Sequence, residues 1–339
     1  MKRLLPLIIL CIVISAGGPA FSDSYLKGVD AYRRGDYQTA TPIVSRLAGQ
    51  NDPRAQNLLG VMYFQGHGVQ RDRDMAIKMY TLAAEQNFAK AQYNLAKLFL
   101  DQTNNPSATK TAVVWLKKSA NQGLVRAEFK LGRLYEDGVG VAQNGEKAVK
   151  WYKRAAEQGH AKAHYRLGYI YEKGKGVDKD IHRAFKWTKS SAILGFAPAQ
   201  ALLAYNYYNG DVVPQDFETA FKWTKMASDQ GYTMAQHNLA KMYADGQGIT
   251  QDYGKALKLY SLAAEQGLEE SQFNLGVMYL KGQGTLSDTI HGLMWLIISS
   301  SSGNDLFNKK RLPIEAAMPA SDVKAAQKLA QEWLAKHKK

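Results

Sequence analysis

The residues best suited to binding chemistry are polar and aromatic side chains that occur three positions apart in repeated segments. Residues three apart lie on one face of a helix, so each pair would share a surface. Amides, ammoniums and guanidiniums there can hold a peptide backbone and a carboxylate, which predicts a site for an acidic or extended segment of a protein partner. A solvated surface is the competing interpretation. The candidate residues are Asn94, Lys97, Lys130, Arg133, Arg166, Tyr169, Tyr205, Asn238 and Lys241.

Residues for catalysis or metal binding are scarce. Cys11 is the only cysteine and lies in an apolar N-terminal run, so the remaining chain has no means of forming a disulfide or a cysteine-based zinc site. His160 and His164 are four apart, but no acid or cysteine completes a metal set. Serines 299–302 lack the Gly-x-Ser-x-Gly pattern of a hydrolase nucleophile. We expect no catalytic residue, metal or cofactor, and predict a binding protein rather than an enzyme.

Positive charge is in excess, with 44 Lys and Arg against 30 Asp and Glu, a net charge of +14. Such a balance favours anionic partners. Nucleic acid is disfavoured because the base-stacking motifs of known modules are absent. One stripe of lysines could contact anionic lipid headgroups or cell-wall polymers, or it could be a solvated outer face. Its members are Lys78, Lys117, Lys150, Lys153, Lys186, Lys189, Lys222, Lys225 and Lys258.

The first 22 residues have the pattern of a secretory signal peptide. A basic start at 1–3 precedes an apolar run at 4–14 and then small residues. The run is about half of the roughly 20 residues that a spanning helix needs, which disfavours an uncleaved anchor. Cleavage is expected after Ser22, or else after Ala20. The pattern predicts export, to the periplasm first and to the medium second.

A period of 36 residues organises the rest of the chain. Each unit opens with a small residue, and these residues form the first column. A leucine stands four positions after each of them, a glycine or alanine five positions after, and a tyrosine or phenylalanine eight positions after. This is an apolar stripe at helical period, so each unit is predicted to open with a helix. The first column is Ala55, Ala91, Ala127, Ala163, Ala199, Ala235 and Ser271.

A second helix is expected in each unit after a turn with two glycines. An aspartate commonly follows the turn and is placed to cap the second helix. That helix carries a mostly tryptophan column, expected to be core, and ends near a glycine that can serve as a C-cap. The capping aspartates are Asp72, Asp180, Asp216, Asp252 and Asp288.

These units define three parts of the chain. After the signal peptide at 1–22, residues 23–306 hold about eight units, and 307–339 form a C-terminal capping helix. Pro313 and Pro319 are expected to break the chain, and Ser321 to cap the final helix. Such an atypical end would cover the apolar face of the last repeat.

The unit at 127–159, AEFKLGRLYEDGVGVAQNGEKAVKWYKRAAEQG, resembles the Sel-one-like repeat, a relative of the tetratricopeptide repeat. The resemblance implies an all-α, right-handed α/α solenoid of helix-turn-helix repeats. It also implies a scaffold or adaptor without enzymatic activity, with the first helices lining a concave groove that would contain the nine candidate residues. Two turns depart from the pattern: 101–106 lacks both glycines, and Val212 replaces the second glycine of another.

Three functions stay open. The first is a periplasmic adaptor, regulator or assembly factor that holds a partner in the groove. The second is a secreted effector that binds a host protein. The third is a cell-wall-associated enzyme or binder, because a few exported members of the family are penicillin-binding or β-lactamase-like. Those members carry a cysteine pair in each repeat, which this sequence lacks.

Overall fold

The computed structural model describes residues 19–102, 105–301 and 303–337, and throughout these ranges the regular structure is α-helical without strands. The chain divides into an N-terminal unit, residues 1–151, and a C-terminal unit, residues 152–339. The first eight helices are α1 (Pro19–Arg33), α2 (Tyr37–Gly49), α3 (Pro53–Gln65), α4 (Arg73–Glu85), α5 (Ala89–Leu100), α6 (Pro106–Asn121), α7 (Val125–Asp137) and α8 (Gly145–Glu157), the last of which contains the boundary.

The C-terminal unit continues with ten further helices. They are α9 (Ala161–Lys173), α10 (Ile181–Ile193), α11 (Ala197–Asn209), α12 (Phe217–Asp229), α13 (Thr233–Asp245), α14 (Tyr253–Glu265), α15 (Glu269–Lys281), α16 (Thr289–Ser300), α17 (Asp305–Ala316) and α18 (Ala320–His337). The predicted signal peptide falls largely outside the described residues, and only 19–22 belong to α1. No helix in the described part of the chain is long and apolar enough to cross a membrane.

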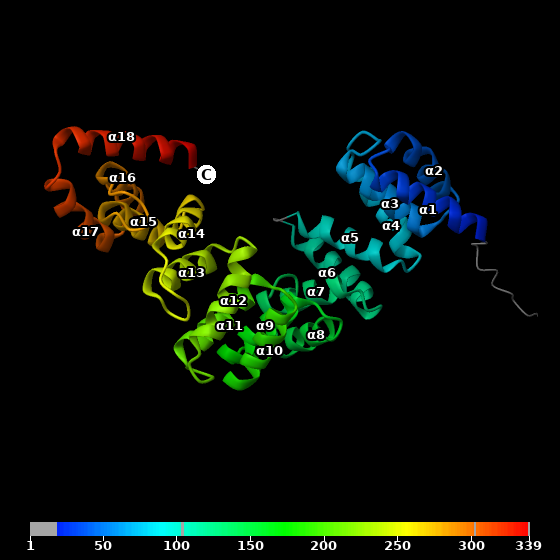
Figure 1. Cartoon of the computed structure of the whole chain (residues 1–339). Coiled ribbons are helices and arrows are strands. Elements are labelled where there is room, and N and C mark those ends of the chain that lie inside the picture. The colour runs from blue at the N-terminus through cyan, green and yellow to red at the C-terminus, as the bar shows by residue number, and fades with distance from the viewer. Residues whose placement is uncertain (1–18, 103–104, 302, 338–339) are drawn as a thin grey trace, which may run out of the picture. The chain divides into compact units, whose positions relative to one another are not determined.

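Within each unit the helices form successive pairs (Figure 1). The first helix of a repeat packs against the second, as α3 does on α4 and α11 on α12, and the second packs against the first helix of the next repeat, as α4 does on α5. This arrangement confirms the predicted all-α solenoid of helix-turn-helix repeats. Its core is a chain of local clusters, because each repeat contacts mainly its neighbours.

The periodic columns form this core. The alanines of the first column are fully buried, and the leucine four residues later is nearly so, from 0% exposed at Leu131 to 6% at Leu59. The small column permits close approach between the two helices of a repeat. A Cβ added at Gly60 would lie 2.7 Å from the Tyr80 ring, and one at Gly276 would lie 2.8 Å from the Gly292 carbonyl oxygen. The tryptophan column differs from expectation, because only Trp295 is fully buried and the others are half-buried.

The aspartate caps are confirmed at the five second helices for which they were predicted. Each aspartate is the N-cap residue, and its carboxylate accepts a backbone N–H from the first turn, at 2.8 Å from Arg183 to Asp180 and at 2.9 Å from Thr219 to Asp216. Asn105 caps α6 in the same way, although its turn lacks both glycines. These bonds satisfy donors that a helix start otherwise leaves unpaired.

The second glycine of the turn lies against the preceding repeat. Gly248 has a φ of +72°, and a Cβ there would meet the Phe217 carbonyl oxygen at 2.3 Å. Gly284 stands in the same relation to Tyr253. The glycine therefore supplies both a left-handed backbone and room for the neighbouring helix start.

A ladder of glutamines, not foreseen from the sequence, links the first helix of a repeat to the end of its second helix. Glutamine stands at five of the seven positions of a column with a 36-residue period, and Glu128 and His164 occupy the other two, so this spacing was a usable signal. In the first four of these glutamines the Oε1 accepts an N–H at 2.7–2.8 Å from a glutamine thirty residues later. We call this set the glutamine ladder: Gln56 with Gln86, Gln92 with Gln122, Gln200 with Gln230, Gln236 with Gln266, and finally Gln272.

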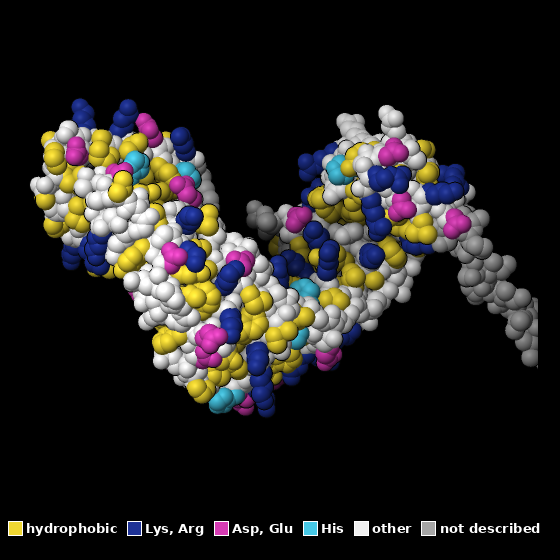
Figure 2. Space-filling model, in the orientation of Figure 1, with side chains coloured by type: hydrophobic (Ala, Val, Ile, Leu, Met, Phe, Trp, Pro, Cys, Tyr) yellow, Lys and Arg dark blue, Asp and Glu magenta, His cyan; other side chains and the backbone are white. Residues whose placement is uncertain are grey.

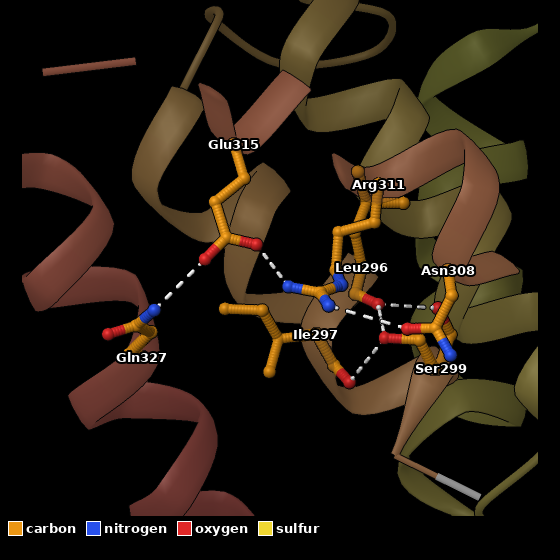
Figure 3. Close-up of polar contacts among 8 residues, drawn as sticks. Leu296, Ile297, Ser299, Asn308, Arg311, Glu315 and Gln327 are labelled. Atoms are coloured by element: carbon orange, nitrogen blue, oxygen red, sulfur yellow. Dashed lines mark hydrogen bonds and ion pairs between the residues drawn. The ribbon is translucent and has the colours of Figure 1, made fainter. Parts of the chain in front are cut away.

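The segment after the last repeat contains two helices. The first, α17, keeps the 36-residue register but replaces the leucine of the core column with Arg311 and the tyrosine with Glu315. Figure 3 shows Glu315 between Arg311, with which it forms an ion pair, and Gln327 of α18, whose amide donates to it at 2.9 Å. A polar cluster therefore takes the place of core residues where the array ends.

Two expectations for this segment are wrong. Pro313 does not break the chain but lies inside α17. Its side chain is exposed, so the carbonyl that loses a helical hydrogen bond can be hydrated. Ser321 is not the cap of the last helix, because α18 begins one residue earlier, directly after Pro319.

Candidate partner-binding surface

The nine candidate residues lie on five first helices, divided between the two units. Asn94, Lys97, Lys130 and Arg133 belong to α5 and α7 of the N-terminal unit. The other five belong to α9, α11 and α13 of the C-terminal unit. Each group is therefore considered by itself.

Three cations gather in the N-terminal unit. Burial lowers the pKa of the half-buried Lys130 ammonium below its ordinary value, and the charges of Arg133 and Lys97 act in the same direction. Asp101 and Asp137 oppose that shift in the Lys130 pKa. Lys97, Lys130 and Arg133, called the basic cluster below, thus hold three positive charges against two nearby carboxylates.

The neighbouring contacts leave much of the basic cluster available. Arg133 reaches Asp137 at 3.4 Å, in an exposed pair of a kind that contributes little energy. Asn94 donates its amide to Asn57 Oδ1 at 2.9 Å, which fixes its side chain beside the cluster on α5. Lys97 is exposed.

In the C-terminal unit a pocket brings together three of the candidates. Tyr205, Asn238 and Lys241 line a cavity of about 230 Å³. The remaining walls include Tyr208, which the sequence analysis did not single out, and Thr224 of the second helix. The Tyr208 hydroxyl bonds to Gln247 in the turn after α13. We call this cavity the tyrosine pocket.

Arg166 and Tyr169 also meet, as their spacing predicted. The Arg166 guanidinium lies 5.2 Å from the centre of the Tyr169 ring, and Lys175 Nζ lies 5.0 Å from the same ring. Both cations therefore lie within cation–π distance of the same ring, an interaction that stabilises each charge. Lys175 belongs to the turn after α9 and was not among the candidate residues.

The lysine stripe of the second helices is exposed at all nine positions. Some of its charge is already paired, since Lys222 contacts Glu218 at 2.7 Å and Lys225 contacts Asp229 at 2.6 Å. On the face seen in Figure 2, Lys and Arg side chains are spread among hydrophobic ones and do not gather in a single patch. The stripe therefore has the features of a solvated surface more than those of a built site.

The histidine pair has structural contacts. His160 is the N-cap of α9, with its Nδ1 accepting the Ala163 N–H at 3.2 Å, and His164 Nε2 lies 3.0 Å from the Ala156 carbonyl oxygen. In the part of the chain that the structure describes, no group of three or more His, Cys, Asp or Glu could hold a metal ion.

The fold is that of a helical repeat scaffold whose first helices carry polar side chains. Seven consecutive segments match the model of the Sel1 repeat, which covers most of the chain, and the chain belongs to that family. The matched segments are 53–88, 89–124, 125–160, 161–196, 197–232, 233–268 and 269–304. Proteins built from this repeat are generally non-catalytic scaffolds for protein–protein interaction.

Several solved structures are similar to this chain. A Sel1 repeat protein from Oxalobacter formigenes is 25% identical, with 87% of this chain and 90% of that one covered and a TM-score of 0.66. A protective antigen with an SLR fold from uropathogenic Escherichia coli is 25% identical over 94% of this chain and 85% of that one, with a TM-score of 0.48. An immunity protein from Pseudomonas aeruginosa is 23% identical over 68% and 83%, with a TM-score of 0.39. A search of curated protein sequences found no match.

Proposed function

We propose that this chain is a protein-binding adaptor whose basic cluster holds an acidic segment of its partner, and that it is not an enzyme. The observation that supports this most is Lys130, a half-buried ammonium whose pKa is lowered by burial and by two neighbouring cations. A partner carboxylate placed there would relieve the repulsion among Lys97, Lys130 and Arg133. Charge-assisted hydrogen bonds from these groups would then fix its position.

The surroundings of the basic cluster suit a peptide. Asn94 lies one helical turn from Lys97 and presents an amide that can bond to a main-chain group of a bound segment. A guanidinium and two ammoniums can share a side-chain carboxylate or a chain terminus. Because the cluster is only partly desolvated, its attraction should weaken as salt rises.

The test is binding of a labelled acidic peptide, rich in Glu, to the full chain by fluorescence anisotropy. The double variant Lys130→Glu with Arg133→Glu should weaken binding by about tenfold or more, since it replaces attraction with repulsion. The matched control is Lys117→Glu with Lys150→Glu, which makes the same charge change on the lysine stripe of the N-terminal unit. Equal affinity of the wild type and the first variant, with helicity retained, would refute the proposal.

We further propose that the adaptor acts outside the cytoplasm, in the periplasm. The support is the pattern of residues 1–22, with a basic start, an apolar run and small residues before the expected cleavage position. Cell fractionation with N-terminal sequencing of the mature protein provides the test. A start at residue 23 or 21 in the periplasmic fraction is expected, release to the medium would favour the secreted effector, and an unprocessed cytoplasmic protein would contradict export.

A further inference from the structure

The glutamine ladder ends at Gln272. This side chain is 3% exposed, and its Nε2 donates to the Ala264 carbonyl oxygen at 3.1 Å, as Gln92 and Gln200 donate to the equivalent carbonyls. In the four preceding members, an N–H from the residue that ends the second helix of the same repeat reaches the Oε1. Among the described residues, none donates to Oε1 of Gln272, and the sequence has serine at 302, where the ladder would require glutamine.

Gln272 lines a cavity of about 580 Å³, called the ladder-end pocket below. Its walls come from the end of α14, the start of α15, the end of α16 and α18, all within the C-terminal unit. Two carboxylates, Glu265 and Glu269, line it, and neither Lys nor Arg is among its lining residues. In a chain with a net charge of +14, this local reversal of sign is selective for a cation.

A flat aromatic wall borders the same pocket. The rings of Trp333 and His337 are stacked, with centroids 3.9 Å apart and an interplanar angle of 12°. Trp333 Nε1 donates to Glu265 Oε2 at 3.0 Å, and His337 Nε2 lies 3.5 Å from the same oxygen. Both contacts use Oε2, so the second oxygen of Glu265 can accept from a ligand.

We propose that the ladder-end pocket binds the guanidinium group of an arginine side chain from a partner peptide. Its several N–H donors can serve Gln272 Oε1 and the carboxylates of Glu265 and Glu269 together. Its plane can stack on the Trp333 and His337 rings. A neutral amide would satisfy Gln272 but not the carboxylates, and a lysine ammonium lacks the planar shape that the aromatic wall selects.

This site is separate from the basic cluster in position and in the sign of its charge. A partner that uses both would present an acidic segment to the N-terminal unit and an arginine to the C-terminal unit. The two bindings are tested independently, since substitutions at Lys130 and Arg133 should leave arginine binding unchanged.

The experiment is isothermal titration of the full chain with a blocked Gly-Arg-Gly peptide, compared with the same peptide containing citrulline. Citrulline keeps the shape and loses the charge, so its peptide should bind about tenfold more weakly or worse. Glu269→Gln should weaken arginine binding by a similar factor, and among the described residues its side chain forms neither a hydrogen bond nor an ion pair with α18. Glu265→Gln should also weaken arginine binding, since it removes the other carboxylate charge. Its amide oxygen can still accept the Trp333 N–H and so keep α18 in place.

The matched control is Glu270→Gln, an exposed carboxylate next to Glu269 that does not line the pocket. It should bind arginine as the wild type does. Gln272→Met, which removes only the buried acceptor and donor, should weaken binding about threefold to tenfold. Equal binding of the arginine and citrulline peptides, or wild-type affinity in both the Glu265 and Glu269 variants, would overturn the proposal.

Discussion

Gly248 shows how a single missing side chain determines the approach of two repeats. Its backbone is left-handed, and a Cβ would lie 2.3 Å from the Phe217 carbonyl oxygen, which is main chain and has little freedom to move. Gly231 also has a positive φ, +79°, but a Cβ there would meet nothing within 4 Å. An added side chain would therefore cause backbone strain alone at Gly231, but both strain and a steric collision at Gly248.

Substitution at these two positions should have unequal costs. We expect Gly248→Ala to lower the free energy of unfolding of the C-terminal unit by about 2–4 kcal/mol, since strain and collision add. Gly231→Ala should cost about 1 kcal/mol, from strain alone. Urea denaturation followed by circular dichroism measures both. Equal losses would mean that the contact with Phe217 is relaxed at little cost.

At the same scale, the sequence predicted some side-chain environments and missed others. The buried leucines and alanines followed from periodicity, because a column that repeats in seven units must meet the same neighbours in each. Lys175 and Tyr208 were missed because their contribution depends on how a turn folds beside a ring, and spacing along one helix carries no such information. Arg311 was missed as a core-column residue because its polar type concealed the continuing register.

The capping aspartates act at the level of the helix. Hydrogen bonds from Thr219, first from its side chain and then from its backbone N–H, hold the pKa of Asp216 below the ordinary value of 3.8. Backbone and side-chain bonds from Lys255 do the same for the pKa of Asp252. A carboxyl whose folded pKa is lowered contributes stability above the unfolded pKa and loses it as the pH falls through the folded value.

This linkage predicts a specific acid response. The variant Asp216→Asn with Asp252→Asn should be nearly as stable as the wild type at pH 7, because asparagine also caps helices. Between pH 4 and about pH 2, its melting temperature should fall less than that of the wild type, because two titrating caps are gone. Thermal melts over that range test this. Asp178→Asn, at a position that caps no helix, is the control and should keep the wild-type slope.

Helix boundaries were predictable where the cap was an aspartate and less so in the C-terminal segment. Asp180 and Asp288 marked their helices because the repeat placed them identically in each turn. The prediction that Pro313 breaks the chain was wrong because it rested on the usual effect of proline in a helix interior. At this exposed position, water can replace the lost hydrogen bond. The sequence also gave no sign that α18 would pack on α16 rather than continue the stack.

For the molecule as a whole, an important property is that four core clusters of the described residues each lie within one unit. One N-terminal cluster includes Tyr80 and Leu95, and one C-terminal cluster joins α13 to α16 and includes Ala326 and Ala330 of α18. A defect at one end should therefore remain near that end, as nearest-neighbour energetics in repeat arrays implies. A single melting temperature would describe such a chain poorly.

Removal of α18 tests this locality. Deleting residues 318–339 takes away α18, which packs on α16, so the cluster that contains the buried Leu293, Trp295 and Ile298 loses part of its cover. The exposed apolar surface should cost several kcal/mol, at about 25 cal/mol per Å² uncovered. Hydrogen exchange measured by mass spectrometry should show faster exchange in α15 and α16, and unchanged protection in α3 to α6.

Lys324→Ala with Lys328→Ala, on the exposed side of α18, is the control and should alter neither region. Intact protection of α16 after the deletion would show that the array does not need this cap, and loss of protection in α3 to α6 would show that the two units do not unfold independently.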